Sequence, residues 1–65
     1  MNYFTVELRH GENKQIWLAC CETEADASLL AREAISALPE ARAEVQPLRG
    51  APPFLLQAGQ VKQWV

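Results

Sequence analysis

Two adjacent cysteines and a single histidine are the residues of this 65-residue chain that could bind a metal or do thiol chemistry. Cys20 and Cys21 fall in a stretch whose composition predicts a β-strand, so their side chains point to opposite faces of a sheet. A structural metal site needs about four ligands at workable spacing, and His10 is the one further good ligand. We therefore expect no metal, no cofactor and two reduced thiols, with Cys20 packed as a small buried apolar residue and Cys21 half-exposed.

The sequence also contains no motif that would bring together the residues of a catalytic site. General base catalysis by His10 would require a nucleophile and an orienting acid beside it, and no motif places Ser28 or any other hydroxyl there. The acids Glu22, Glu24 and Asp26 lack the glycine and the spacing of a calcium loop, and they suit the start of a helix, where the dipole favours negative charge. We expect no catalytic residues and a protein that is not an enzyme.

Composition narrows the classes of partner. The net charge is −2, with six lysines and arginines against eight acids, whereas a nucleic-acid-binding domain normally carries a basic patch. No apolar run approaches the 18 or so residues of a membrane helix, and the N-terminus lacks the charged and apolar regions of a secretion signal. The chain is therefore expected to be cytoplasmic, without membrane contact, evident small-molecule substrate or general affinity for nucleic acids.

The short length of the chain limits the stability that its fold can reach. Residues 1–65 suffice for one domain, and a chain this short buries only about 60% of the surface that it exposes when unfolded. Small domains in this position are often stabilised by a partner, so we expect a homodimer or a complex with another protein.

Hydrophobic patterning predicts an α+β fold: a small antiparallel sheet of four or five strands with one helix on one face, in the order β-β-α-β-β. Residues 1–9 alternate between apolar and polar, and residues 15–21 follow after a polar turn, which predicts a hairpin. The alternation also predicts the phase of each strand, meaning which side chains face the helix: these are Phe4, Val6, Leu8, Ile16, Leu18 and Cys20. Trp17, Ala19 and Cys21 then face away from the helix.

A helix is predicted from the N-cap Thr23 to about Leu38, with Pro39 as the stop. Thr23 and Asp26 have the spacing of a capping box. An apolar stripe at helical spacing comprises Ala27, Leu30, Ala31, Ala34, Ile35 and Leu38.

The C-terminal third is less regular. Residues 41–48 predict a weaker strand with Ala43 and Val45 inward, and Pro47 must lie at its end or on an edge. The breakers in residues 48–53 predict a loop. Residues 54–65 fit either a hairpin turning at Gly59 or one last strand after an extended segment.

Two resemblances concern topology. The strand-strand-helix order, with Thr23-Glu24-Ala25 and the run Ala31-Arg32-Glu33-Ala34-Ile35, resembles the small antitoxin domain of the HicB type over about the first 40 residues. That family usually links its last strand to the helix through glycines, where this chain has Cys20-Cys21-Glu22. The order β-β-α-β-β also resembles small phage-encoded inhibitors. Fold likeness does not fix function, and no functional residue is carried over.

The sheet face without a helix is the predicted functional surface. In the predicted phase it presents four side chains suited to partner binding: Tyr3, Trp17, Cys21 and Trp64. Tyrosine and tryptophan are enriched at interface hot spots, so the leading hypothesis is a non-enzymatic protein-interaction module, homodimeric or docking a larger protein. Internal packing of Trp17 is the competing interpretation. The alternative function is an antitoxin-like or nucleic-acid-associated regulatory domain, in which sheet aromatics stack on bases beside Arg9 and Lys14.

Overall fold

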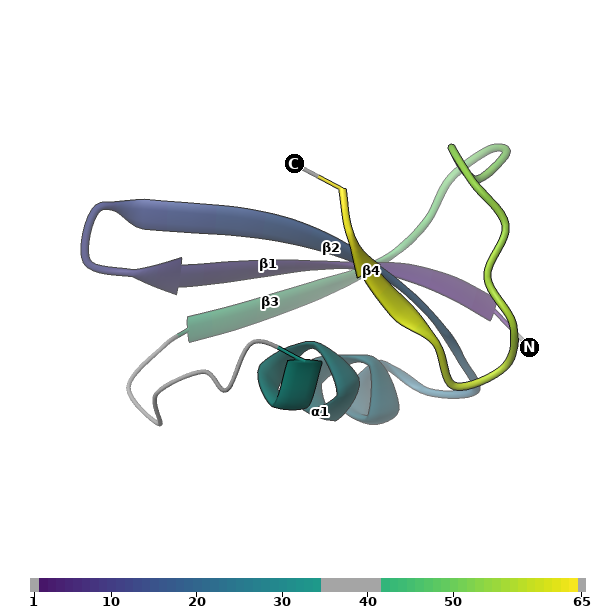
Figure 1. Cartoon of the computed structure of the whole chain (residues 1–65), viewed down its shortest axis with the longest axis horizontal. Coiled ribbons are helices and arrows are strands. Elements are labelled where there is room, and N and C mark those ends of the chain that lie inside the picture. The colour runs from purple at the N-terminus through teal and green to yellow at the C-terminus, as the bar shows by residue number, and fades with distance from the viewer. Residues whose placement is uncertain (1, 35–41, 65) are drawn as a thin grey trace.

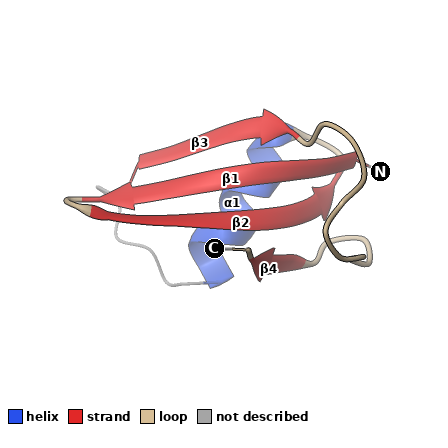
Figure 2. Cartoon of the chain, turned by 90° about the horizontal axis from the view of Figure 1, so that it is seen from above, coloured by secondary structure: helices blue, strands red, loops and turns tan. Residues whose placement is uncertain are grey.

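The computed structural model describes residues 2–34 and 42–64, which form a four-stranded antiparallel sheet with one helix against one face (Figure 1). In chain order the elements are β1 (Asn2–His10), β2 (Asn13–Cys21), α1 (Glu24–Ala34), β3 (Arg42–Pro47) and β4 (Val61–Gln63). The strands lie in the order β3-β1-β2-β4 (Figure 2), so the long central hairpin is flanked by the two later strands. The predicted α+β class, with a small antiparallel sheet and one helix, is confirmed.

The β1–β2 hairpin turns through two residues. His10 lies opposite Asn13, which leaves Gly11 and Glu12 as the turn. Gly11 has a φ of 62°, a left-handed conformation that tight hairpin turns require and that glycine adopts without steric cost. This turn sets the register of the whole hairpin, which ends with Asn2 opposite Cys21.

The core lies between the sheet and α1. Its buried members are Phe4, Val6, Leu8, Trp17, Ala19, Cys21, Ala27 and Ala31. The helix contributes two alanines, whose short side chains let its backbone approach the strands closely. Leu30, Ala43, Val45 and Val61 pack around this cluster, so the predicted inward orientation of Ala43 and Val45 is confirmed.

Thr23 caps α1 as predicted. Its Oγ1 accepts a hydrogen bond from the Asp26 N–H at 3.2 Å, and its carbonyl accepts the Ala27 N–H at 3.1 Å. Capping satisfies backbone donors that have no partner within the first helical turn. The predicted helix end near Leu38 lies outside the described residues.

The C-terminal part forms one short strand after an irregular segment. Residues 48–60 contain no strand, and β4 follows, which matches the second of the two arrangements expected for residues 54–65. Gly59 has a φ of 80°, and the Gln60 N–H donates to the Gln57 carbonyl at 3.0 Å to close a turn just before β4.

Candidate functional site

Trp17 and Cys21 lie on the helix-covered face, and this corrects the predicted phase of the second strand. Val6 and Trp17 are opposite each other in the ladder, and the two cross-strand partners of an antiparallel pair share a face. Trp17 is 9% exposed and Cys21 is 5% exposed. Neither side chain therefore contributes to the face that the helix leaves open, and the expectation that both would point away from the helix was wrong.

The reason for the error is that β2 is apolar on both sides. Every residue from Trp17 to Cys21 is buried, so the hydrophobic pattern of this strand has no clear period of two. The phase is set instead by the two-residue turn, since a shift of one residue would move every side chain of the strand to the other face.

Tyr3 lies on the open face and fastens a crossing segment to it. Its hydroxyl accepts a hydrogen bond from the Leu56 N–H at 2.9 Å and donates one to the Leu56 carbonyl at 3.1 Å. Residues 48–60 pass across the ends of β1 and β2 on their way from β3 to β4 (Figure 2). Leu18 and Cys20 belong to the open face, yet their exposures are 0% and 4%. The segment therefore acts as a partial second layer.

Both ends of this crossing segment, residues 48–60, extend the sheet ladder. The Leu48 N–H donates to the Tyr3 carbonyl at 2.9 Å, and the Gly59 N–H donates to the Cys20 carbonyl at 2.8 Å. Phe54 lies near the middle of the crossing segment, and the Nζ of Lys62 in β4 lies 5.0 Å from the centre of its ring, a cation–π distance. The face expected to be uncovered is thus covered at one end and open towards the β1–β2 turn.

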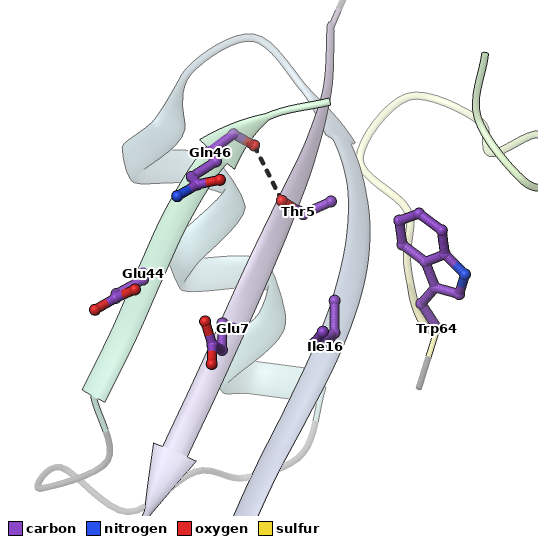
Figure 3. A pocket seen from close by; sticks show the side chains of 6 residues that line it. All are labelled: Thr5, Glu7, Ile16, Glu44, Gln46 and Trp64. Atoms are coloured by element: carbon purple, nitrogen blue, oxygen red, sulfur yellow. Dashed lines mark hydrogen bonds between the residues drawn. The ribbon is translucent and has the colours of Figure 1, made fainter. Parts of the chain in front are cut away.

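A hollow of about 360 Å³ occupies the part of the face that remains open (Figure 3). Its lining residues are Thr5, Glu7, Ile16, Glu44, Gln46 and Trp64. Trp64 stands beside β2, where its N–H donates to the Ile16 carbonyl at 2.7 Å, and it is 41% exposed. The Thr5 hydroxyl lies 3.4 Å from the Gln46 carbonyl, on the opposite side of the hollow. A large aromatic side chain thus borders a concave, mixed polar and apolar surface.

Charges of both signs line the open face next to this hollow. The Arg9 Nη2 lies 2.7 Å and the Lys14 Nζ 3.6 Å from the same oxygen of Glu7. The hydrogen bond from Arg9 and the two positive charges hold the pKa of Glu7 below its usual value, and Glu7 in turn raises the pKa of Arg9. Across the β1–β3 ladder Glu7 lies opposite Glu44, and Arg9 lies opposite Arg42.

A second hollow, of about 390 Å³, lies beside α1. Its lining includes Cys21, Asp26, Leu29 and Gly59. Burial, followed by the negative charge of Asp26, raises the pKa of the Cys21 thiol, whose Sγ lies 3.3 Å from the Thr23 carbonyl. A thiol nucleophile reacts as the thiolate, so this environment makes Cys21 a poor nucleophile.

Within residues 2–34 and 42–64, no three side chains of His, Cys, Asp or Glu gather in a way that could hold a metal ion. His10 is exposed at the end of β1. No helix in that part of the chain is long and apolar enough to cross a membrane. The chain matches no protein-family model, no curated protein and no solved structure.

Of the four residues predicted for partner binding, the structure places two on the open face, Tyr3 and Trp64, and brings only Trp64 to the hollow. Sequence reasoning did not identify the other five lining residues, Thr5, Glu7, Ile16, Glu44 and Gln46, and it placed Ile16 on the helix-facing side. The inward orientation predicted for Ala43 and Val45 already places Glu44 and Gln46 on the face away from the helix, but their position beside β1 follows from a pairing between distant parts of the chain.

Proposed function

We propose that this protein is a non-enzymatic interaction module that binds a segment of a partner protein in the hollow beside Trp64. The observation that carries the proposal is the half-exposed Trp64 indole at the edge of a concave surface floored by Ile16. Tryptophan is the residue most enriched among binding hot spots, which lie in pockets that exclude water. Thr5 and Gln46 add hydroxyl and amide groups that can orient a bound backbone.

A protein segment suits this surface because it has an apolar side, formed by Ile16 and Trp64, and a polar side formed by residues of β1 and β3 (Figure 3). An apolar side chain of the partner would bury the Trp64 ring and Ile16, which is favourable at about 25 cal/mol per Å². The other exposed large apolar residues, Leu29 and Leu55, are 58% and 85% exposed and lie outside the hollow. Trp64 is therefore the aromatic side chain that lines the hollow, and Leu55 supplies a matched control.

The test is a selection of peptides from a random displayed library against the immobilised protein. Peptides that bind the native chain should lose binding to Trp64→Ala and keep it with Leu55→Ala. Since Trp64 is 41% exposed at the end of the chain, its replacement should leave the fold intact, which the amide spectrum of the variant would verify. Peptides that bind both variants equally, or a selection that yields none, would contradict the proposal.

A second candidate is binding of single-stranded nucleic acid, favoured by one observation. Arg9 lies opposite both Lys14 and Arg42, so three cations gather at the turn end of the open face. Phosphate contacts of this kind make binding salt-dependent. The carboxylates of Glu7 and Glu44 lie between these cations and Trp64 and would repel a backbone phosphate, so the protein partner is the preferred proposal. Salt-dependent binding of a fluorescent oligonucleotide would reverse that preference.

A further inference from the structure

β3 is an edge strand whose outer backbone groups point away from the sheet. The Leu48 N–H donates to the Tyr3 carbonyl, so these two residues form a hydrogen-bonded pair. Hydrogen-bonded pairs alternate along an antiparallel ladder, so the backbone groups of Gln46, Glu44 and Arg42 also point inward, towards β1. The N–H and C=O groups of Ala43 and Val45 therefore face outward. Such an edge is a template on which another strand can pair.

The side chains of this edge are poorly matched to their inner neighbours. On the open face Glu44 lies opposite Glu7, and Arg42 lies opposite Arg9. Like charges directly opposite each other destabilise a sheet. The attraction of Glu44 for Arg9 along the diagonal, which contributes to the raised pKa of Arg9, offsets part of this cost. Arg42 and Glu44 thus alternate in sign along an edge where each faces a like charge on its inner side.

We propose that β3 pairs with β3 of a second copy in antiparallel register centred on Ala43, so that Arg42 of each copy lies opposite Glu44 of the other. A two-fold axis perpendicular to the sheet relates the copies and keeps both open faces on the same side. Ala43 then exchanges both backbone hydrogen bonds with its counterpart. Arg42 and Glu44 occupy the non-hydrogen-bonded positions, where opposing side chains come closest.

Side-chain charge and the supply of backbone N–H donors favour the register centred on Ala43 over registers centred on the adjacent residues. A pairing centred on Glu44 would put two carboxylates opposite each other beside both Glu7 side chains, and one centred on Arg42 would oppose two guanidinium groups. A pairing centred on Val45 would place Pro47 opposite Ala43 in a hydrogen-bonded position, where proline has no N–H to donate. The Ala43-centred register avoids both problems.

This interface goes beyond the proposed function because it uses the edge strand β3, at the edge of the sheet opposite to β4, although Glu44 also lines the hollow. In the order β3-β1-β2-β4, the β3 edge is separated from Trp64 by the two strands of the hairpin. Dimerisation therefore leaves the Trp64 indole accessible, and the dimer presents two copies of the hollow on one continuous face.

Sedimentation of the full chain over a wide concentration range, at low salt, tests the proposal through a charge exchange. We expect a reversible dimer for the native chain. Arg42→Glu alone and Glu44→Arg alone each create two repulsive pairs and should raise the dissociation constant about tenfold. The double variant Arg42→Glu/Glu44→Arg restores opposite charges in this register and should return to within about twofold of the native constant.

A folding defect would not mimic this outcome. Within one chain, Glu44→Arg places a cation opposite Glu7, so the variant should resist urea at least as well as the native chain while dimerising more weakly. Ala43→Pro deletes an outward N–H and should also abolish the dimer, with the β1–β3 ladder kept. Trp64→Ala should dimerise normally, so loss of peptide binding and loss of dimerisation are separable.

Three results would each overturn the proposal. The native chain could remain monomeric up to about 1 mM, where association would be too weak to matter. The double charge exchange could fail to restore the dimer, which would exclude the Ala43-centred register. Ala43→Pro could leave the dimer intact, which would place the interface elsewhere.

Discussion

The two hydrogen bonds of the Tyr3 hydroxyl make its removal an informative perturbation. In Tyr3→Phe the ring stays and both bonds to Leu56 are lost. A hydrogen bond contributes about 0.5–1.5 kcal/mol net, and unmet buried groups cost more. Because this site is only half buried, water can restore part of the loss, and we expect the free energy of unfolding to fall by about 1–2 kcal/mol. For a domain of this size that corresponds to a drop of roughly 5–15 °C in Tm.

Urea unfolding followed by tryptophan fluorescence measures this change, and amide hydrogen exchange localises it. The Leu56 N–H should exchange much faster in Tyr3→Phe, because its acceptor has gone. The Cys20 N–H, bonded to the Gln60 carbonyl at 3.0 Å, should keep most of its protection. Thr5→Val is the control, since its hydroxyl makes one long, exposed bond, and it should change stability by less than about 0.5 kcal/mol.

The reasoning fails if Tyr3→Phe is as stable as Thr5→Val and the exchange of the Leu56 N–H is unchanged. In that case the crossing segment would be held by the hydrogen bonds at its two ends, and the phenol group would contribute nothing to its attachment.

The remaining predictions concern the core, the helix cap and one surface charge. Trp17→Ala should cost about 3–5 kcal/mol, close to the whole stability of a domain this small, so its amide spectrum should collapse where that of Trp64→Ala stays dispersed. Thr23→Ala should lower the free energy of unfolding in urea by about 1 kcal/mol through loss of the cap. Glu7 should titrate below 4.5 in an NMR pH series and return towards that value in Arg9→Gln. The stabilisation from this pair is therefore present above about pH 4.5 and is lost as the pH falls through the lowered pKa.

Local sequence signals predicted the elements well. Alternation in β1, the cap at Thr23 and the breakers before β4 each report a physical preference of a short stretch, and each agrees with the structure. The phase of β2 failed because both its faces are buried, so no solvent-facing side chains mark its orientation. The length of the turn decides this orientation. The prediction left residues 10–14 between the strands, whereas the turn consists of Gly11 and Glu12 alone.

The site could be predicted only in part, because it depends on contacts between distant residues. Trp64 was identified from its residue type alone. That Glu44 lies opposite Glu7 follows from β3 returning to pair with β1, about forty residues earlier in the chain, and composition does not encode that register. Likewise the hydrogen bonds between Tyr3 and Leu56 depend on residues 48–60 crossing the sheet, and the breakers in that segment predict a loop without saying what it covers.

The two adjacent cysteines have a practical consequence. Cys20 is buried on the face that the crossing segment, residues 48–60, passes over, and Cys21 lies in the core on the α1 side, so consecutive residues sit in different layers of the molecule. Opening of either layer exposes the thiol beneath it to alkylation. The relative labelling rates of the two, read from one peptide in a mass spectrum, would therefore show which layer detaches first, without any engineered probe.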